Sequence, residues 1–356
     1  MSFDETVFIT GFPGFIAGRL IERLAAAGAR LLLLVQPSLL ERARQDLERI
    51  TLRQDIPVNA FRILPGDITA ENLGLSLRDL EIARHETNSI FHLAALYDLA
   101  VPRELGLQIN VGGTKQVNAF ARRLRNLRRY HYVSTCYVAG RRKGVILETE
   151  LAHEAGFRNF YEESKHLAEL EVEALKTELP VTIHRPAVVC GDSQTGETGK
   201  YDGIYYLIHY LLKMPRFVSL LNIGNRQVSL NLVPIDFVVE AMSALAQDDQ
   251  AIGKTLQLAD HRPLTTHALF NEIAREVNQS GSRITIPARV VEFTLMLPPS
   301  PAITGLPHPA VPYFFLKQTY DTTQSKALLD KHGVVCPPFS DYVRNIVEFA
   351  AKHPQL

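Results

Sequence analysis

The stretch that decides the fold is Thr6-Val7-Phe8-Ile9-Thr10-Gly11-Phe12-Pro13-Gly14-Phe15-Ile16-Ala17. A β-branched and aromatic run ends at two glycines three residues apart, and apolar residues then recur at helical spacing, which predicts a strand, a tight turn and a helix. Gly11 lets the chain turn sharply, Gly14 leaves bare main chain for an anion, and Ala17 lets the helix pack closely on the strand. The turn is therefore a candidate phosphate site, although its pattern alone also fits plain α/β packing.

Composition narrows the class of protein. The chain has 356 residues, of which 46% are apolar and 21% charged, as in globular proteins with one large core or two unequal ones. Lys plus Arg and Asp plus Glu both number 38, so neither nucleic acid nor an anionic membrane surface is expected as a partner. Charges and a proline within residues 201–221 argue against a membrane span there. A small-molecule ligand is the better expectation.

The cysteines and the N-terminus give no sign of secretion. Cys136, Cys190 and Cys336 are widely spaced, with no Cys-x-x-Cys and no His pair at metal-ligand spacing beside them. We therefore expect buried reduced thiols, with neither a disulfide framework nor a metal site. The N-terminus carries no basic region followed by an apolar run, so no signal peptide is expected and the predicted location is cytoplasmic.

The first half of the chain alternates strand and helix patterns. The expected strands cover residues 31–35, 60–64, 89–93, 129–134 and 181–185, and the expected helices cover residues 39–50, 76–85, 111–127 and 160–177. Strands that alternate with helices form a parallel sheet with helices on both faces. The prediction is an α/β fold with a Rossmann-type doubly wound sheet, in which ligands bind beyond the carboxyl ends of the strands.

A candidate general acid follows one of these strand ends. Ser134-Thr135 closes the strand, and Tyr161 and Lys165 lie four apart on the next helix, hence on one face. A lysine ammonium beside the phenol would lower its pKa from the reference value of about 10, which suits a general acid. The alternative is a chance pair on a surface helix, which the preceding Ser134-Thr135 and the glycine turn make less favourable.

A set of motifs in a fixed order carries a resemblance to a known family. The motifs are Thr10-Gly11-x-x-Gly14-x-x-Ala17, Gly66-Asp67-Ile68-Thr69, His92-x-Ala94-Ala95, Asn110-Val111-x-Gly113-Thr114, Ser134-Thr135, Tyr161-x-x-x-Lys165 and Arg185-Pro186. Together they resemble the extended short-chain dehydrogenase/reductases. Residues 66–76, 91–95 and 231–236 are further similar to the male sterility protein-like branch, which holds fatty acyl-CoA reductases and the thioester reductase domains of carboxylic acid reductases and peptide synthetases.

The resemblance implies a role for each matching residue. Tyr161 would donate a proton, Lys165 would hold the nicotinamide ribose, and Thr135 would hydrogen-bond the substrate carbonyl. Asn110 would hold a water or a backbone carbonyl in a proton relay, and a helix N-cap is a compatible alternative for it. Asp67 would flank the adenine, unless it only shapes a turn. The implied cofactor-binding residues are Thr10, Gly11, Phe12, Pro13, Gly14, Phe15, Ile16, Gln36, Arg42, Asp67, Ile68, Ala94, Ala95, Tyr161, Lys165, Pro186 and Val188.

The end of the second strand bears on the choice of cofactor. It reads Val35-Gln36-Pro37-Ser38, without the acid that binds the ribose 2′-hydroxyl in NAD-using relatives. Arg42 and Arg44 follow on the next helix, where they would favour a 2′-phosphate unless they form only a solvated face. NADP(H) is therefore the expected cofactor, and NAD(H) is the alternative.

Beyond residue 190 the alternating pattern ends. The predicted division is an NAD(P)-binding domain of residues 1–190 plus 225–260 and a smaller, mainly helical substrate domain of residues 191–224 plus 261–356. Residues 228–239 are expected to return to the sheet. The apolar segment 201–221 is expected either to form an acyl-binding wall beside Tyr161 or to pack in the core or on a second subunit. The predicted substrate residues are Tyr97, Cys136, Tyr205 and Ile208.

The sequence thus predicts an NADPH-dependent reductase of the extended short-chain type that acts on an acyl thioester or the corresponding aldehyde. Hydroxysteroid or ketone dehydrogenases and sugar-nucleotide epimerases or dehydratases share the fold and are the enzymatic alternatives. A dinucleotide-binding protein without activity is a further alternative, which the intact Thr135, Tyr161 and Lys165 disfavour. The expected partners are a small acyl or carbonyl substrate on coenzyme A or acyl carrier protein, and a second copy in a homodimer.

Overall fold

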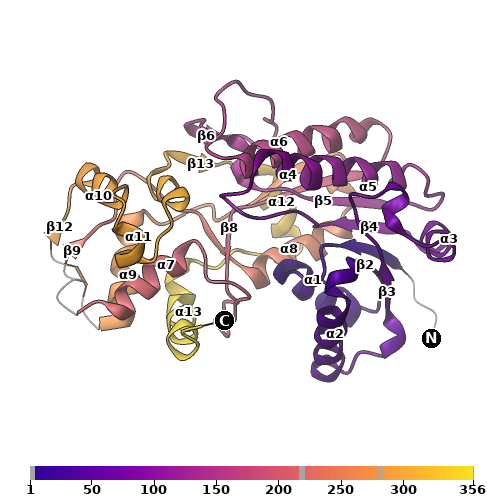
Figure 1. The fold of residues 1–356 in the computed structure, drawn as a ribbon, viewed down its shortest axis with the longest axis horizontal. Helices are drawn as coiled ribbons and strands as arrows, with labels where there is room; N and C mark the ends of the chain where they lie inside the picture. Colours follow the sequence, from indigo (N-terminus) through magenta and orange to yellow (C-terminus); the bar gives the residue numbers. More distant parts are fainter. Residues whose placement is uncertain (1–4, 216–220, 279–280, 283, 356) are drawn as a thin grey trace.

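A parallel sheet of seven strands lies in the larger part of the protein, away from the end that holds α9 (Thr266–Asn278), α10 (Ala288–Leu295) and α11 (Ser300–Thr304) (Figure 1). The computed structural model describes residues 5–215, 221–278, 281–282 and 284–355. The sheet order is β11-β7-β5-β4-β1-β2-β3, and chain order reverses at the neighbouring pair β1 and β4. Ligands of doubly wound sheets bind beside such a reversal. The strands are β1 (Thr6–Thr10), β2 (Arg30–Val35), β3 (Phe61–Pro65), β4 (Ser89–His92), β5 (Arg129–Val133), β7 (Val181–Pro186) and β11 (Thr255–Leu258).

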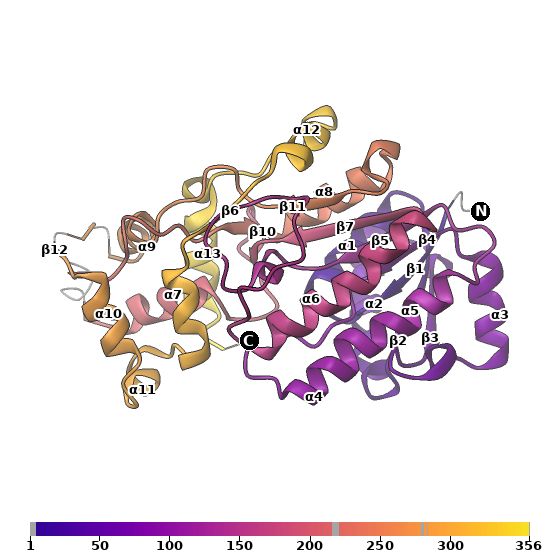
Figure 2. The ribbon, with the colours of Figure 1, turned by 90° about the horizontal axis from the view of Figure 1, so that it is seen from above.

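Helices cover both faces of this sheet (Figures 1 and 2). Because both faces are buried, strands such as β2 are continuous apolar runs and do not alternate with polar residues. Val7 and Ile9 enter one core, and Phe8, which points to the opposite face, enters the other. The first core lies under α1 (Phe15–Ala26), α2 (Leu40–Gln54), α8 (Ile235–Ala246) and α12 (Thr323–Lys331), and the second under α3 (Leu77–Glu86), α5 (Gly113–Ala121) and α6 (Phe160–Glu173). The predicted fold class is confirmed.

One helix begins earlier than the sequence suggested. It runs from α4 (Arg103–Gly106) through a π-helical turn (Leu107–Gly112) into α5. The expectation of an N-cap at Asn110 is wrong, because Asn110 lies inside the π turn and is buried there. A π turn widens the helix locally and often occurs at functional sites.

Helices from the second half of the chain form a second region at one end of the molecule (Figure 1). Residues of α7, α9 and α13 share one apolar core, in which Ile208, Phe270 and Tyr342 are nearly inaccessible to solvent. Its helices are α7 (Ile204–Lys213), α9 (Thr266–Asn278), α10 (Ala288–Leu295), α11 (Ser300–Thr304) and α13 (Phe339–Lys352). The short 3-10 helices of the chain are Pro37–Leu39, Val58–Ala60, Glu71–Gly74, Cys136–Ala139, Ala174–Thr177, Asp249–Ala251 and His308–Phe315.

Three small parallel pairs tie distant segments together. They are β6 (Gly144–Ile146) with β13 (Gln318–Tyr320), β8 (Val188–Cys190) with β10 (Leu232–Pro234), and β9 (Leu221–Asn222) with β12 (Ile284–Thr285). The expectation that residues 228–239 return to the central sheet is wrong, because only β10 is a strand there and it pairs with β8 before α8 begins. The proposed division into two domains stays a prediction.

Two further observations concern the described residues only. No helix among them is both long and apolar enough to cross a membrane. Within the same residues, no group of three or more His, Cys, Asp or Glu side chains could hold a metal ion. Cys136, Cys190 and Cys336 are buried free thiols, as expected.

Candidate active site

The glycine turn leaves room for an anion at the start of α1. Gly11 has φ +94°, and a Cβ there would lie 2.7 Å from the backbone nitrogen of Ala94. A Cβ on Gly14 would lie 2.7 Å from the carbonyl oxygen of Gly11, so both positions require glycine. The first turn of α1 contains no acidic residue. Its N–H groups lack carbonyl partners within the helix and can bind a pyrophosphate, so the turn fits a dinucleotide.

A buried chain of hydrogen bonds fixes this turn to the next strand and helix. Thr10 Oγ1 lies 2.7 Å from His92 Nδ1, and His92 Nε2 lies 3.0 Å from Thr114 Oγ1. The amide of Ala94 donates to Thr10 Oγ1 at 3.1 Å. Burial lowers the pKa of His92 to about 3, and the charge of Lys165 adds to this effect. The neutral imidazole therefore acts as a spacer that sets the distance between β1, β4 and α5.

The residues expected around the adenine and ribose also gather at the strand ends. Asp67 accepts hydrogen bonds from the amide of Thr69 at 2.8 Å and from Gln36 Nε2 at 3.1 Å. Ile68 is buried and packs against Gly113, where a Cβ would lie 2.5 Å from the Ile68 side chain. Arg42 lies on the exposed side of α2, with Nε 3.9 Å from Asp46. The second strand ends without an acidic residue, but the Asp67 carboxylate lies beside Gln36 in the structure.

The remaining expected cofactor residues occupy the edges of the same region. Ala94 and Ala95 directly follow β4, Pro186 ends β7, and Val188 begins β8. The amide of Ala187, between them, donates to the carbonyl oxygen of Leu258 at 3.0 Å. Ala94, Ala95 and Pro186 thus lie at the carboxyl ends of β4 and β7, the two strands that flank β5 in the sheet.

Tyr161 lies in the first turn of α6, next to Thr135. Asn159 caps this helix, because its Oδ1 accepts a hydrogen bond from the amide of Glu162 at 3.0 Å. Burial raises the pKa of Tyr161, and its hydrogen bond with Thr135 opposes that rise. The expected lowering of the Tyr161 pKa is therefore wrong for this structure, and the phenol keeps the proton that a general acid needs.

Lys165 points toward the end of β5. Its Nζ donates to the hydroxyl of Tyr132 at 3.0 Å and to the carbonyl oxygen of Val133 at 2.8 Å, and lies 4.5 Å from the centroid of the Tyr132 ring. Burial lowers the pKa of Lys165 to about 8, against the opposing charge of Glu169. Sequence analysis missed Tyr132, because the strand pattern marks it only as a buried residue.

Asn110 supports the catalytic helix from the π turn. Its Oδ1 accepts from the amide of Leu96 at 2.7 Å, and its Nδ2 donates to the Leu96 carbonyl oxygen at 3.3 Å and to Ser164 Oγ at 2.9 Å. The side chain thus links the segment after β4 to α6 beside Lys165. The sequence analysis expected Asn110 to hold either a water or a backbone carbonyl, and the Leu96 carbonyl oxygen is such a partner.

The four expected substrate residues separate into two groups. Tyr97 packs edge-on against Tyr161, with ring centroids 5.1 Å apart. Cys136, Tyr205 and Ile208 are instead core residues. The Sγ of Cys136 donates to the carbonyl oxygen of Arg185 at 3.1 Å, and the hydroxyl of Tyr205 accepts from the amide of Gly191 at 2.9 Å. Tyr205 and Ile208 lie on the face of α7 that packs against α9 and α13, so the structure favours core packing, the alternative to an acyl wall, for these two residues. Cys136 belongs to a separate small core with Ile146 and Tyr320. Residues 216–220 of the segment lie outside the described chain.

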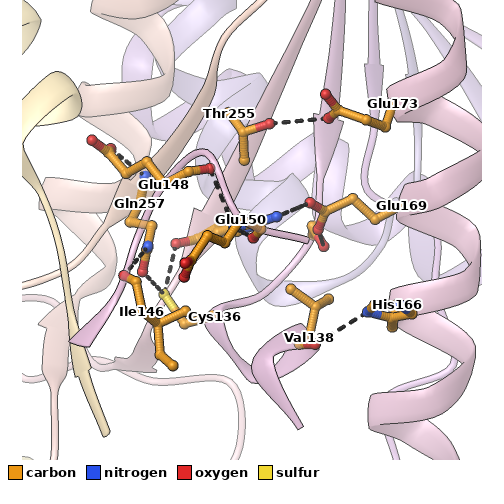
Figure 3. A network of polar contacts seen from close by, with 12 residues as sticks. Cys136, Val138, Ile146, Glu148, Glu150, His166, Glu169, Glu173, Thr255 and Gln257 are labelled. Atoms are coloured by element: carbon orange, nitrogen blue, oxygen red, sulfur yellow. Dashed lines mark hydrogen bonds and ion pairs between the residues drawn. The ribbon is translucent and has the colours of Figure 1, made fainter. Parts of the chain in front are cut away.

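A buried polar network includes Cys136, Glu169 and Gln257 (Figure 3). Arg185 donates from Nε to Glu169 Oε1 at 2.8 Å and from Nη1 to the carbonyl oxygen of Glu150 at 3.0 Å. Ser134 donates to the same carboxylate of Glu169. Glu148 accepts from the amide of Gln257 at 2.9 Å. This network joins β5, β7, β11 and α6, and the Arg185-Pro186 motif was the only sign of it in the sequence.

A second contact joins the catalytic helix to the last third of the chain. The hydroxyl of Tyr313 donates to Glu162 Oε1 at 2.6 Å and accepts from Asn159 Nδ2 at 2.8 Å. Arg158 Nη1 donates to the same oxygen of Glu162 at 3.0 Å. Glu162 follows Tyr161 directly and is fully buried. No local pattern in the sequence indicates a contact across so many residues.

This combination of a dinucleotide turn with Thr135, Tyr161 and Lys165 agrees with a comparison to known families. The sequence model of the male sterility protein family, an NAD-binding family, matches residues 9–242. The chain belongs to this family. The predicted nicotinamide-dependent oxidoreductase of the extended short-chain type is confirmed at the level of the family.

Several proteins that are similar to this chain are reductases by name. Glycine betaine reductase ATRR of Emericella nidulans is 27% identical over 285 residues, which are 76% of this chain and 22% of that protein. Fatty acyl-CoA reductase wat of Drosophila melanogaster is 26% identical over 285 residues, which are 69% of this chain and 54% of that protein. The chain thus spans from about a fifth to about half the length of these relatives. The terminal R domain from the myxalamid PKS-NRPS pathway superposes with a TM-score of 0.83 at 25% identity, covering 100% of this chain and 92% of that one.

Proposed function

We propose that the chain is an NADPH-dependent reductase of acyl thioesters or of the corresponding aldehydes. The observation that carries the proposal is that Tyr161 lies next to Thr135, while Lys165 contacts Tyr132 and Val133 at the end of the same strand, β5. This strand neighbours β4, at which the chain order of the sheet reverses. A protein that only binds dinucleotide needs no proton donor there. The fatty acyl-CoA reductase and R-domain relatives support the thioester as substrate.

Thr135, Tyr161 and Lys165 would each have a separate role in the reduction of the carbonyl group. A bound nicotinamide dinucleotide supplies the hydride that reduces the carbonyl carbon. Thr135 and Tyr161 donate hydrogen bonds to the carbonyl oxygen, where negative charge develops, and Tyr161 then gives that oxygen its proton. An aldehyde becomes an alcohol in this step, whereas a thioester becomes a hemithioacetal, whose C–S bond then breaks to release the thiol and an aldehyde. Lys165 supplies a positive charge that stabilises the resulting tyrosinate. General-acid assistance of this kind contributes about 10²- to 10⁴-fold in rate.

NADPH is the proposed cofactor, although the structure places Asp67 beside Gln36. Asp67 is already engaged by Gln36 and Thr69, and the first turn of α2 supplies Arg42 and Arg44 on its exposed side. Replacing both arginines by alanine should raise the KM for NADPH more than the KM for NADH. Equal use of both cofactors by the parent enzyme would contradict the preference.

The activity test compares carbonyl classes. NADPH oxidation is measured with acyl-CoA esters, carrier-bound thioesters, aldehydes and ketones, on the parent and on Tyr161→Phe. We expect turnover of thioesters or aldehydes, and a loss of at least about 10²-fold in Tyr161→Phe with cofactor binding retained, because only the proton donor is removed. Lys165→Ala should impair both turnover and cofactor binding. Turnover of ketones alone would assign the protein to the ketone dehydrogenases, and near-parent activity of Tyr161→Phe would refute the mechanism.

A further inference from the structure

A cation from the chain itself lies over the ring of Tyr97, which packs against Tyr161. Lys200 Nζ lies 4.8 Å from the centroid of the Tyr97 ring and 3.7 Å from Asp202 Oδ2. The Tyr97 ring in turn packs edge-on against Tyr161, with centroids 5.1 Å apart. An aromatic face next to a carboxylate is the arrangement that binds ammonium groups. The site therefore already holds an ammonium, supplied by a lysine.

Two separate segments build this group. Tyr97 comes from the segment after β4, and Lys200 and Asp202 come from the loop before α7. The Asp202 side chain is 21% exposed. Burial raises the pKa of Asp202, and Lys200 opposes that rise. A partly buried carboxylate of this kind is stabilised by any cation that takes the place of Lys200.

The residues around Tyr97, Lys200 and Asp202 are polar and aromatic, whereas a wall for an acyl chain would be aliphatic. Burial raises the pKa of Tyr97, and the Asp202 carboxylate and the phenol groups of Tyr161, Tyr137 and Tyr206 add to that rise. The aliphatic side of α7, with Ile208 and Leu211, faces the core. A chain of methylene groups would therefore meet hydroxyl groups here, whereas an ammonium would meet ring faces and a carboxylate.

Lys200 is held loosely enough to be replaced. Its side chain is 60% exposed, and an exposed ion pair at 3.7 Å contributes little to stability. The lysine can swing into solvent, where its charge is well hydrated, while a bound ligand becomes desolvated against Tyr97 and Asp202. Cation–π attraction is stronger for a desolvated cation than for an exposed one.

We infer that Tyr97 and Asp202 bind an ammonium or quaternary ammonium group on the acyl part of the substrate, and that Lys200 occupies this position until the substrate enters. This inference rests on the proposed function and names a substrate class for it: short acyl thioesters or aldehydes that carry a positive charge. The charged group then lies next to Tyr161, within one short acyl unit of the reacting carbonyl.

A pair of isosteric aldehydes tests the inference. Trimethylammonioacetaldehyde and 3,3-dimethylbutanal have the same shape, and only the first is charged. We expect kcat/KM for the cation to exceed that for the neutral aldehyde at least tenfold in the parent, with NADPH saturating. Asp202→Asn should reduce this ratio at least tenfold, and Lys200→Met should increase it, because the internal competitor is gone. Glu197→Gln, which changes a 43% exposed carboxylate of the same loop, is the matched control and should leave the ratio unchanged.

The outcomes separate this inference from the proposed function. Turnover of both aldehydes without preference, or an equal loss for both in Asp202→Asn, overturns the cation site and leaves the reductase intact. If Lys200 instead bound an anionic carrier, Lys200→Met would weaken acyl-CoA turnover and leave the ratio unchanged, which also overturns the inference.

A binding measurement keeps the inference testable without activity. Calorimetry with choline and its neutral isostere 3,3-dimethylbutanol, on the NADP⁺-bound protein, should show tighter binding of choline in the parent and not in Asp202→Asn. Equal or absent binding of choline would overturn the cation site even if no aldehyde were reduced.

Discussion

Lys165 Nζ lies 3.0 Å from the hydroxyl oxygen of Tyr132, and both groups are buried. The tyrosine therefore orients the lysine through its hydroxyl as well as through its ring. Tyr132→Phe keeps the ring and removes the hydroxyl partner. We expect a higher KM for NADPH and a lower kcat, because Lys165 loses its fixed direction. A hydrogen bond to a charged group contributes about 1.5 to 3 kcal/mol, so the change in kcat/KM should be roughly tenfold or more.

A matched control for this variant lies on the same strand. Tyr130 is equally buried, but its hydroxyl donates to Asn118 Oδ1 at 2.7 Å, away from Lys165. Tyr130→Phe should lower thermal stability to a similar degree and leave the kinetic constants close to those of the parent. Similar kinetics in both variants would show that Tyr132 has only a structural role.

The pH dependence of reduction should report on Lys165. Its pKa is lowered to about 8, so the ammonium that supports Tyr161 is present below that pH and is lost above it. Tyr161, whose pKa is raised, keeps its proton over the same range. We expect kcat/KM for the carbonyl substrate, measured from pH 6 to 10, to be level at low pH and to fall above about pH 8. A rise with pH would contradict the assignment of Lys165 as a required cation.

The Arg185–Glu169 pair should behave as a buried pair rather than as a surface salt bridge. Glu169→Gln leaves the Arg185 guanidinium buried without a counter-charge, which costs about 3 to 5 kcal/mol in the free energy of unfolding. The double variant Glu169→Gln and Arg185→Met removes both charges and should recover part of that loss. Urea unfolding of the parent, both single variants and the double variant measures the coupling. Additive losses would show that the two groups do not interact.

Tyr313 should affect catalysis from a distance. Tyr313→Phe removes the hydroxyl that holds Glu162, the neighbour of Tyr161, so we expect kcat to fall while the KM for NADPH, set at the glycine turn, stays the same. Tyr320→Phe is the control, because its hydroxyl donates to Gln318 at 3.1 Å within the same part of the chain. A lower thermal stability with unchanged kcat would reduce Tyr313 to a structural contact.

Local sequence patterns predicted the strands of the sheet and the helix that carries Tyr161 and Lys165. The strand, glycine turn and helix at the start of the chain depend on neighbouring residues, and the spacing of Tyr161 and Lys165 places both on one face of α6. Because all seven strands are parallel, the motifs that follow them lie along the same edge of the sheet. These features are determined by contacts within a few residues or by the topology of alternating elements.

Non-local contacts account for what the sequence did not reveal. The apolar spacing of α7 correctly marks a buried face, but it does not say whether that face meets substrate or the helices α9 and α13. Asn110 precedes a good helical pattern, yet the helix begins at Arg103 because the π turn accommodates the residues between. Likewise, Lys165 on α6 binds Tyr132 of strand β5. Glu162 on the same helix binds Tyr313, from the last third of the chain.

The pairing of β6 with β13 has a consequence for how the molecule is assembled. About half the chain separates these two strands, and a parallel pair gains no hydrogen bonds until that long loop has closed. Contacts of such high sequence separation slow folding. Glu148, just after β6, also binds the amides of Gln324 and Ser325 at the start of α12. Glu148 can therefore bind these amides only after the chain has been synthesised beyond Ser325, so the contacts that anchor α12 beside β6 depend on nearly the whole chain being present.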